Sequence, residues 1–129
     1  MNNASTRTVL LADASADNRL PLRQALSAVG FTVAEVGNGK DAIEALRRDR
    51  FDVVVTDLWM PGADGIEVIQ SIRTVSPLST IFVVTGGGPG LSIASAAALA
   101  RVWGARKVYV KPFEISELIQ EIVILFPPL

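Results

Sequence analysis

Runs of apolar residues typical of β-strands alternate along the chain with segments of helical periodicity. The periodicity predicts strands at 8–12, 32–36, 53–56, 80–84 and 107–110, and helices at 18–29, 40–48, 65–75, 91–102 and 115–125. Strands and helices that alternate in this way build a parallel sheet with helices on both faces. We therefore predict an α/β fold, doubly wound around a five-stranded parallel sheet.

The predicted strands differ in how their apolar residues are distributed. Residues 53–55 and 81–84 are continuously apolar, as expected for strands covered by helices on both faces. Residues 32–36 alternate between apolar and polar positions, which is typical of an edge strand. The first, third and fourth strands are therefore expected in the middle of the sheet.

Glycine and polar capping residues mark the expected ends of the helices. Gly30 and Gly104 follow the first and fourth helices, Asn38 with Gly39 precedes the second, and Asp64 precedes the third. Glycine tolerates the left-handed backbone that commonly follows a helix, and Asn or Asp accepts hydrogen bonds from the first helical turn. For the first helix, Asp17 is better placed as the cap than Asp13.

Polar residues follow four of the five predicted strands. Asp13 comes after the first strand, Asp57 after the third, Thr85 after the fourth and Lys111 after the fifth. The carboxyl ends of parallel strands meet at one edge of the sheet, where ligands bind in folds of this kind. Taken singly, each residue has an ordinary explanation as a turn or capping residue. Taken together, they predict a site at this edge.

The composition of the chain excludes several classes of function. With 129 residues it has the size of one domain, and we expect a single domain over 1–129 with its core at about 8–125. The net charge of −1, with basic residues that are not clustered, argues against nucleic acid or a membrane surface as partner. The chain has no cysteine and no histidine, which excludes thiolate or imidazole metal ligands and a Ser-His nucleophile.

The two ends of the sequence bear on its location. Residues 1–8 are polar with one arginine, unlike a secretory signal, and the apolar runs are too short to span a bilayer. The last residues, 126–129, end the fifth helix with two prolines and leave no room for a second domain. A cytoplasmic protein without an attached output domain is expected.

The residues at the strand ends carry a family resemblance. Asp13, Asp57-Leu58-Trp59-Met60-Pro61 with Asp64-Gly65, Thr85-Gly86, and Lys111-Pro112-Phe113 together resemble the receiver domain of bacterial response regulators. The resemblance covers about 8–124. It implies the flavodoxin-like fold with strand order 2-1-3-4-5, and a phosphoacceptor in two-component signalling that acts as a stand-alone receiver rather than as an enzyme. A flavin carrier or hydrolase on the same fold is the rival, although residues 12–17 are acidic where a flavin carrier has a phosphate-binding loop.

The resemblance also implies roles for individual residues. Asp57 is the phosphoacceptor and takes a phosphoryl group from a histidine kinase or a phosphotransfer protein. Lys111 supplies a positive charge and Thr85 a hydroxyl donor to that group, and Lys111-Pro112 is a cis peptide. Mg²⁺ is expected between Asp13, Asp57 and the backbone carbonyl of Trp59.

Two positions near Asp57 depart from the family pattern. Ala14 stands where receivers carry a second acid that touches the metal, so we expect Mg²⁺ to bind weakly. Trp59 is larger than the residue usual at its position, and its indole could restrict access to the site. Two interpretations remain: phosphorylation with a weakly held metal, or a phosphorylation-independent module for protein interaction.

The segments expected to transmit the signal to a partner also depart from the receiver-family pattern. Val108 stands where the family often has a switching aromatic residue, and Tyr109 is expected on the opposite face of its strand. The predicted helix 91–102 is apolar nearly all round. We predict a protein contact, including self-dimerisation, through the fourth helix, fifth strand and fifth helix. The alternative to this contact is that helix 91–102, rich in small residues, packs closely on its own sheet.

The glycine-rich segment 86–90 lies beside the predicted site. It is either an ordinary loop or a loop whose backbone N–H groups bind phosphate.

Overall fold

A computed structural model describes residues 7–86 and 92–127. Five parallel strands form one sheet in the order β2-β1-β3-β6-β7, which confirms the predicted α/β fold and strand order, with β6 and β7 as the fourth and fifth strands. These strands are β1 (Arg7–Ala12), β2 (Phe31–Val36), β3 (Val53–Thr56), β6 (Thr80–Thr85) and β7 (Ala105–Val110).

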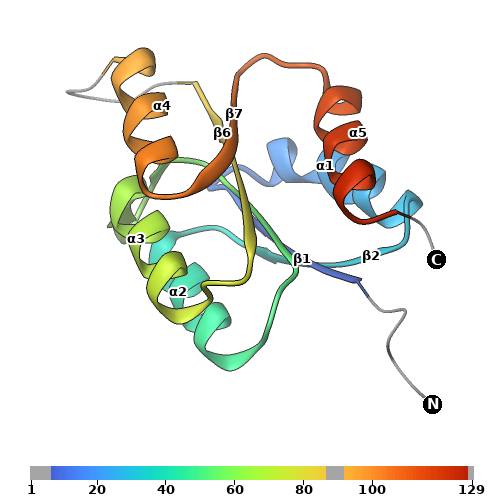
Figure 1. Ribbon diagram of the computed structural model, residues 1–129, viewed down its shortest axis with the longest axis horizontal. Coiled ribbons are helices and arrows are strands. Elements are labelled where there is room, and N and C mark those ends of the chain that lie inside the picture. Colours follow the sequence, from blue (N-terminus) through green and yellow to red (C-terminus); the bar gives the residue numbers. More distant parts are fainter. Residues whose placement is uncertain (1–6, 87–91, 128–129) are drawn as a thin grey trace.

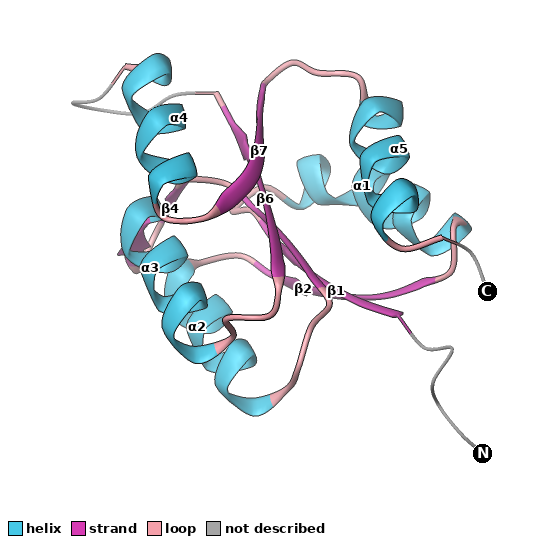
Figure 2. Cartoon of the chain, in the orientation of Figure 1, coloured by secondary structure: helices cyan, strands magenta, loops and turns pink. Residues whose placement is uncertain are grey.

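Helices cover both faces of this sheet (Figure 1, Figure 2). Helices α1 (Ala16–Ala28) and α5 (Ile115–Leu125) pack on one face, with Leu22, Leu26, Leu118 and Ile122 buried against it. Helices α2 (Gly39–Arg48), α3 (Gly65–Val75) and α4 (Ile93–Val102) pack on the other. The α1–α5 face and the α2–α3–α4 face therefore enclose two separate apolar cores.

The strand patterns follow from these two cores. Val53 and Val55 lie in the α1–α5 core and Val54 in the α2–α3–α4 core, and all three are fully buried. A strand buried on both faces favours apolar side chains throughout, which explains the continuous apolar run at 53–55. In β2, Phe31 alone is fully buried, as expected for the edge strand that its alternation predicted.

The helix ends agree with the predicted signals except at α1. Gly30 and Gly104 adopt positive φ angles of 97° and 107°, and Asn38 caps α2 by accepting the Asp41 N–H at 2.8 Å. The prediction that Asp17 caps the first helix is wrong, because α1 begins two residues earlier and Ser15 accepts the Asn18 N–H at 3.2 Å. The Asp64 side chain and most of the glycine-rich segment 86–90 lie outside the described part.

The segment after Asp57 contains a hairpin that the pattern did not predict. Strands β4 (Trp59–Met60) and β5 (Ala63–Asp64) pair antiparallel, and Gly62 turns between them with a φ of 92°. Two-residue strands are too short to produce a periodic signal, so only the turn residues were visible in the sequence. The hairpin directs the chain from Asp57 towards α3 (Figure 2).

Helix α4 packs on the sheet through its small residues. Ala96 and Ala100 are fully buried, whereas Leu99, Val102 and Trp103 keep 38%, 78% and 41% of their surface exposed. The small-residue alternative therefore explains the inner side of α4, while its larger apolar side chains stay exposed. Within residues 7–86 and 92–127, no helix has the length and apolar character needed to cross a membrane.

Candidate phosphoacceptor site

Asp13 and Asp57 are held at adjacent strand ends by backbone hydrogen bonds. The Asp57 N–H donates to the Ala12 carbonyl at 2.9 Å, and the Asp13 N–H donates to the Val36 carbonyl at 3.1 Å. Each bond continues the pairing of neighbouring parallel strands by one residue. The two residues are only 3% and 8% exposed, so the sheet delivers two nearly buried carboxylates to one edge, as the sequence predicted.

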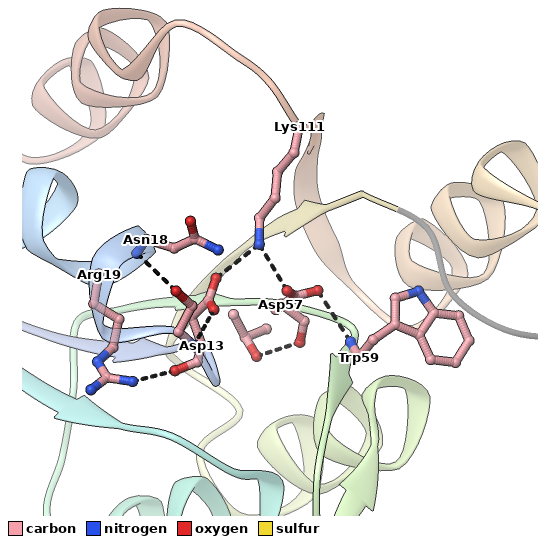
Figure 3. A network of polar contacts seen from close by, with 8 residues as sticks. Asp13, Asn18, Arg19, Asp57, Trp59 and Lys111 are labelled. Atoms are coloured by element: carbon pink, nitrogen blue, oxygen red, sulfur yellow. Dashed lines mark hydrogen bonds and ion pairs between the residues drawn. The ribbon is translucent and has the colours of Figure 1, made fainter.

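Lys111 joins these two carboxylates. Its Nζ lies 2.9 Å from Oδ2 of Asp13 and 2.9 Å from Oδ2 of Asp57 (Figure 3). The backbone fixes the position of the lysine, because the Lys111 N–H donates to the Thr85 carbonyl at 2.8 Å. The Lys111-Pro112 peptide is cis, as the resemblance implied. Residues far apart in the sequence thus form one ionic cluster.

The electrostatics of this cluster favour a charged lysine. Burial by itself lowers the pKa of Lys111, but the hydrogen bonds and charges of Asp57 and Asp13 outweigh this effect and raise the pKa above its ordinary value of 10.5. Lys111 therefore remains an ammonium group at neutral pH. It is a fixed positive charge beside two potential oxygen nucleophiles.

The other oxygen of each carboxylate accepts a backbone N–H. Oδ1 of Asp57 accepts from Trp59 at 3.1 Å, and Oδ1 of Asp13 accepts from Ser15 at 2.9 Å. Below them, the Thr56 hydroxyl donates to the Asp57 carbonyl at 2.9 Å. The two backbone N–H donors orient the carboxylates of Asp57 and Asp13 towards Lys111. Ser15 could have been found from its cap position before α1.

Thr85 lies at the same edge, at the end of β6. It is fully buried and pairs in register with Val110, directly before Lys111. The stem of Lys111 passes close to Gly86, where an added Cβ would lie 3.8 Å from the Lys111 Cβ. The structure thus brings all four predicted residues to one edge and places Asp13, Asp57 and Lys111 in direct contact.

The Trp59 side chain does not cover this cluster. Its indole extends away from Asp57 and Lys111 in Figure 3, and packs against the α2–α3–α4 core. The Nε1 of the indole is buried and has no hydrogen-bond partner in the described part of the chain. The expectation that Trp59 restricts access is therefore not met, because the β4–β5 hairpin turns the residue aside.

Arg19 supports the site and was missed as a functional residue. Its guanidinium donates to the Asp13 carbonyl (Figure 3). Its Nε lies 3.0 Å from Oε1 of Glu35. Arg23 reaches the other oxygen of Glu35 at 3.3 Å. These contacts tie α1 to β2 around the Asp13 loop. A lone arginine in a helix gives no sequence signal for such a role.

The donor set suits a hard cation but is small. The carboxylates of Asp13 and Asp57 and the carbonyl of Trp59 are the oxygen ligands that Mg²⁺ prefers. Ala14, exposed beside Asp13, adds no third carboxylate. In residues 7–86 and 92–127 no group of three or more acidic, histidine or cysteine side chains could hold a metal. These residues thus fit Mg²⁺ with one charged ligand fewer than the pattern with two adjacent acids, because Ala14 takes the place of the second acid.

A cavity of about 380 Å³ opens beside the cluster. Asp13 and Lys111 form one side of it, and α1 and the segment after β7 form the rest, with Pro21, Leu22 and Phe113 among the lining residues. A wall with acidic and basic side chains next to an apolar one can admit a partner side chain to Asp13 and Lys111.

Comparisons with known proteins agree with this geometry. A sequence model of the response regulator receiver domain matches residues 9–123. The chain is 30% identical over 115 residues to the chemotaxis protein CheY of Thermotoga maritima, covering 88% of this chain and 92% of that protein. It is 34% identical over 119 residues to the response regulator receiver protein CpdR of Brucella abortus, covering 90% and 93%.

The solved structures show the same fold. A CheY-like receiver domain protein from Methanospirillum hungatei superposes with a TM-score of 0.84 at 19% identity, over 94% of each chain. At this identity the likeness concerns the fold alone, and the family follows from the sequence matches.

Proposed function

This chain belongs to the response regulator receiver family of two-component signalling, and from that premise we propose that Asp57 accepts a phosphoryl group from a histidine kinase or a phosphotransfer protein. The observation that carries the proposal is the position of Lys111 Nζ, 2.9 Å from both buried carboxylates. We expect the exchange to take place in the cytoplasm.

The contacts of Asp57 suggest how the transfer proceeds. A carboxylate oxygen of Asp57 attacks the phosphorus, the bond from phosphorus to the donor nitrogen breaks, and the released imidazole keeps the electron pair and takes up a proton. Lys111 then shifts from the Asp57 carboxylate to the phosphoryl oxygens. Because this lysine is already charged and anchored through its backbone to Thr85, it needs little rearrangement. The Thr85 hydroxyl is the proposed second donor.

Receiver domains generally bind Mg²⁺ at the phosphorylation site. Here the Asp13 and Asp57 carboxylates and the Trp59 carbonyl would hold the ion, which neutralises phosphoryl oxygens during transfer. We propose that it binds weakly, because Ala14 removes a charged ligand and Lys111 already compensates the two remaining carboxylates. Lys111 thus takes a larger share of the neutralisation.

The donor histidine is proposed to approach through the cavity next to Asp13 and Lys111. Its apolar wall, with Leu22 and Phe113, can pack against a partner helix while Lys111 meets the incoming phosphoryl group. This arrangement supports a protein rather than a free nucleotide as donor.

For the output we propose a protein contact, including a homodimer, through α4, β7 and α5. Leu99, Val102 and Trp103 of the α4 region and Val110 of β7 are 38–78% exposed and can pack against another apolar surface. Tyr109 is buried in the α1–α5 core, with its ring tilted against that of Phe113 at a centroid distance of 5.4 Å, while Val108 packs towards the α2–α3–α4 core. The usual aromatic switch therefore has no residue on the α4 side of β7. Sedimentation with and without a phosphodonor tests the contact, and a monomer under both conditions contradicts the homodimer.

The alternative of a phosphorylation-independent interaction module has no observation in its favour. A module of that kind needs only its surface, whereas this chain places a lysine between two nearly buried aspartates at some cost in desolvation.

Intact-mass analysis after incubation with acetyl phosphate and Mg²⁺ tests the phosphoacceptor. The wild type should gain the mass of one phosphoryl group, and Asp57→Asn should gain none. Asp49→Asn, an exposed carboxylate at the other end of the sheet, is the matched control and should behave as the wild type. The proposal fails when Asp57→Asn is modified to the same extent, or when no donor and no divalent cation supports uptake.

A further inference from the structure

A second cavity, of about 360 Å³, lies at the edge of the sheet opposite to Asp57. The end of α2 with its connection to β3 forms one side, and the end of α3 with the loop to β6 forms the other. Strands β3 and β6 begin here, whereas the carboxylates lie where the strands end. Helices α2 and α3 lie side by side in Figure 1, so residues distant in the sequence share this cavity.

Three arginines line this cavity: Arg47, Arg48 and Arg50. Asp49 is the single acid among its described lining residues, and it contacts Arg48 at 3.4 Å with side chains that are 58% and 67% exposed. Such an exposed pair is weak. Arg47 and Arg50 have no carboxylate partner among the described side chains, so two guanidinium groups are available to a ligand.

The helix dipole does not account for all of this charge. The carboxyl end of a helix carries roughly half a negative charge. The positive charge of Arg47 and Arg48 in the last turn of α2 is already larger than that. Arg50 lies beyond the helix, after the Asp49 cap. A positive charge remains that intramolecular contacts do not neutralise.

The cavity also has an apolar part. Leu46 is buried at 4% exposure, Val75 is partly buried, and Leu78 is 77% exposed at the rim. An exposed leucine next to free guanidinium groups suits a ligand with an apolar side chain and flanking carboxylates. Arginine binds carboxylates in a planar two-point geometry. Nucleic acid would need a longer basic stripe, and the chain has a net charge of −1.

We propose that this cavity binds an acidic segment of a partner protein, with an aliphatic side chain placed against Leu78 and carboxylates on Arg47 and Arg50. The segment binds at the opposite edge from the phosphoacceptor. It can therefore remain bound while the donor protein occupies the Asp57 side, and the surface serves to recruit a partner.

Fluorescence anisotropy with a labelled peptide, Gly-Glu-Glu-Leu-Glu-Glu-Gly, tests this proposal on the full chain. We expect saturable binding that weakens with salt, and no binding of the matching peptide with lysine in place of glutamate. The double variant Arg47→Ala/Arg50→Ala should weaken binding about tenfold, since two exposed ion pairs are lost. Arg101→Ala, an exposed arginine in α4 without an ion pair among the described residues, is the control and should leave it unchanged.

Further variants separate the contributions to binding. Leu78→Ser should remove the preference for this peptide over one with serine in place of leucine. Asp57→Asn should bind as the wild type, which keeps this outcome independent of the phosphoacceptor proposal. Circular dichroism of each variant confirms that it folds.

Three results would overturn the proposal. The first is no saturable binding of the acidic peptide to the wild type. The second is an equal loss of affinity in Arg101→Ala, which would indicate unspecific charge attraction. The third is displacement of the peptide by a short single-stranded DNA at lower concentration than by unlabelled peptide, which would assign the cavity to nucleic acid.

Discussion

The two ends of the sheet differ in whether their charged side chains are buried and paired. At the end where the strands finish, Lys111 lies between Asp13 and Asp57, and the side chains of the two acids are 4% and 12% exposed. At the end where the strands begin, Arg47 and Arg50 line an open cavity without carboxylate partners among the described side chains.

This difference suits the Asp57 end of the sheet to a chemical reaction and the arginine end to binding a partner. Paired charges away from water interact strongly and keep a fixed geometry, as phosphoryl transfer requires. Exposed charges interact weakly with their own chain and stay available to a partner. We therefore expect substitutions at the Asp57 end to change stability and reactivity, and substitutions at the arginine end to change only binding.

The largest effect is expected for Lys111→Met. The substitution leaves two nearly buried carboxylates without their cation, and we expect the free energy of unfolding to fall by about 2 kcal/mol, with loss of phosphoryl uptake. Urea denaturation and intact mass measure the two effects. In the control, Arg106→Met removes an exposed pair with Glu121 at 3.3 Å and should cost less than about 0.5 kcal/mol. Equal losses in the two variants would contradict a special role for the buried cluster.

The next effect concerns the metal. Ala14→Asp adds a carboxylate beside Asp13 and should raise the affinity for Mg²⁺ about tenfold, or about 1.4 kcal/mol. Trp59 fluorescence in a Trp103→Phe background reports binding, because the backbone N–H of Trp59 donates to Oδ1 of Asp57, one of the proposed Mg²⁺ ligands. Ala16→Asp, at an equally exposed position in the first turn of α1, is the control. If micromolar Mg²⁺ quenches Trp59 fluorescence of the Trp103→Phe protein that keeps Ala14, the affinity of the site for Mg²⁺ is not weak.

A smaller effect is expected from pH. The pKa of Lys111 is raised in the folded protein, so its stabilising contribution is complete below the unfolded value near 10.5 and is lost as the pH rises through the folded value. Tyr109 acts in the same direction, because burial and then the charges of Glu121 and Glu117 raise its pKa above 10.0.

Denaturation curves between neutral and strongly alkaline pH can separate these two groups. In a Tyr109→Phe background, stability should still decline above pH 10.5 with Lys111 present. The decline should be reduced in the Tyr109→Phe/Lys111→Met variant. Identical slopes for both proteins would refute the contribution of the lysine.

The smallest effect is expected at the arginine end. Arg47→Ala/Arg50→Ala should change the free energy of unfolding by no more than about 0.5 kcal/mol, because neither side chain has a carboxylate partner among the described residues. Phosphoryl uptake should also stay unchanged. A loss comparable to that of Lys111→Met would mean that the arginines are structural.

Most of the fold could be predicted because each strand and helix has a local pattern. The apolar run 53–55 in β3 and the alternation in β2 indicated the places of these strands in the sheet. The prediction failed where the signal was short or ambiguous. Asp17 was predicted as the cap of α1, whereas Ser15, which has a side chain equally able to cap a helix, takes this position. The β4–β5 hairpin has too few residues for a periodic pattern.

The residues of the site could be predicted, but not all of their surroundings. Asp13, Asp57 and Lys111 directly follow parallel strands and Thr85 ends one, and such strands finish at one edge of the sheet. Arg19 was missed because its contact with the Asp13 carbonyl depends on how α1 packs against β2. The direction of the Trp59 indole depends on the hairpin in the same way.

The sequence pattern alone determined the α/β class, the central and edge strands and the edge of the sheet that carries the site, since these follow from local periodicity and from residues at the strand ends. The full strand order and the phosphoacceptor chemistry were implied by the resemblance to the receiver family. Only the tertiary structure decided that Lys111 contacts both carboxylates, that Trp59 turns away, and that α2 and α3 bring Leu78 beside three arginines. The physical reason is that these contacts join segments far apart in the chain. Their distances depend on how helices pack across a twisted sheet, which local pattern does not encode.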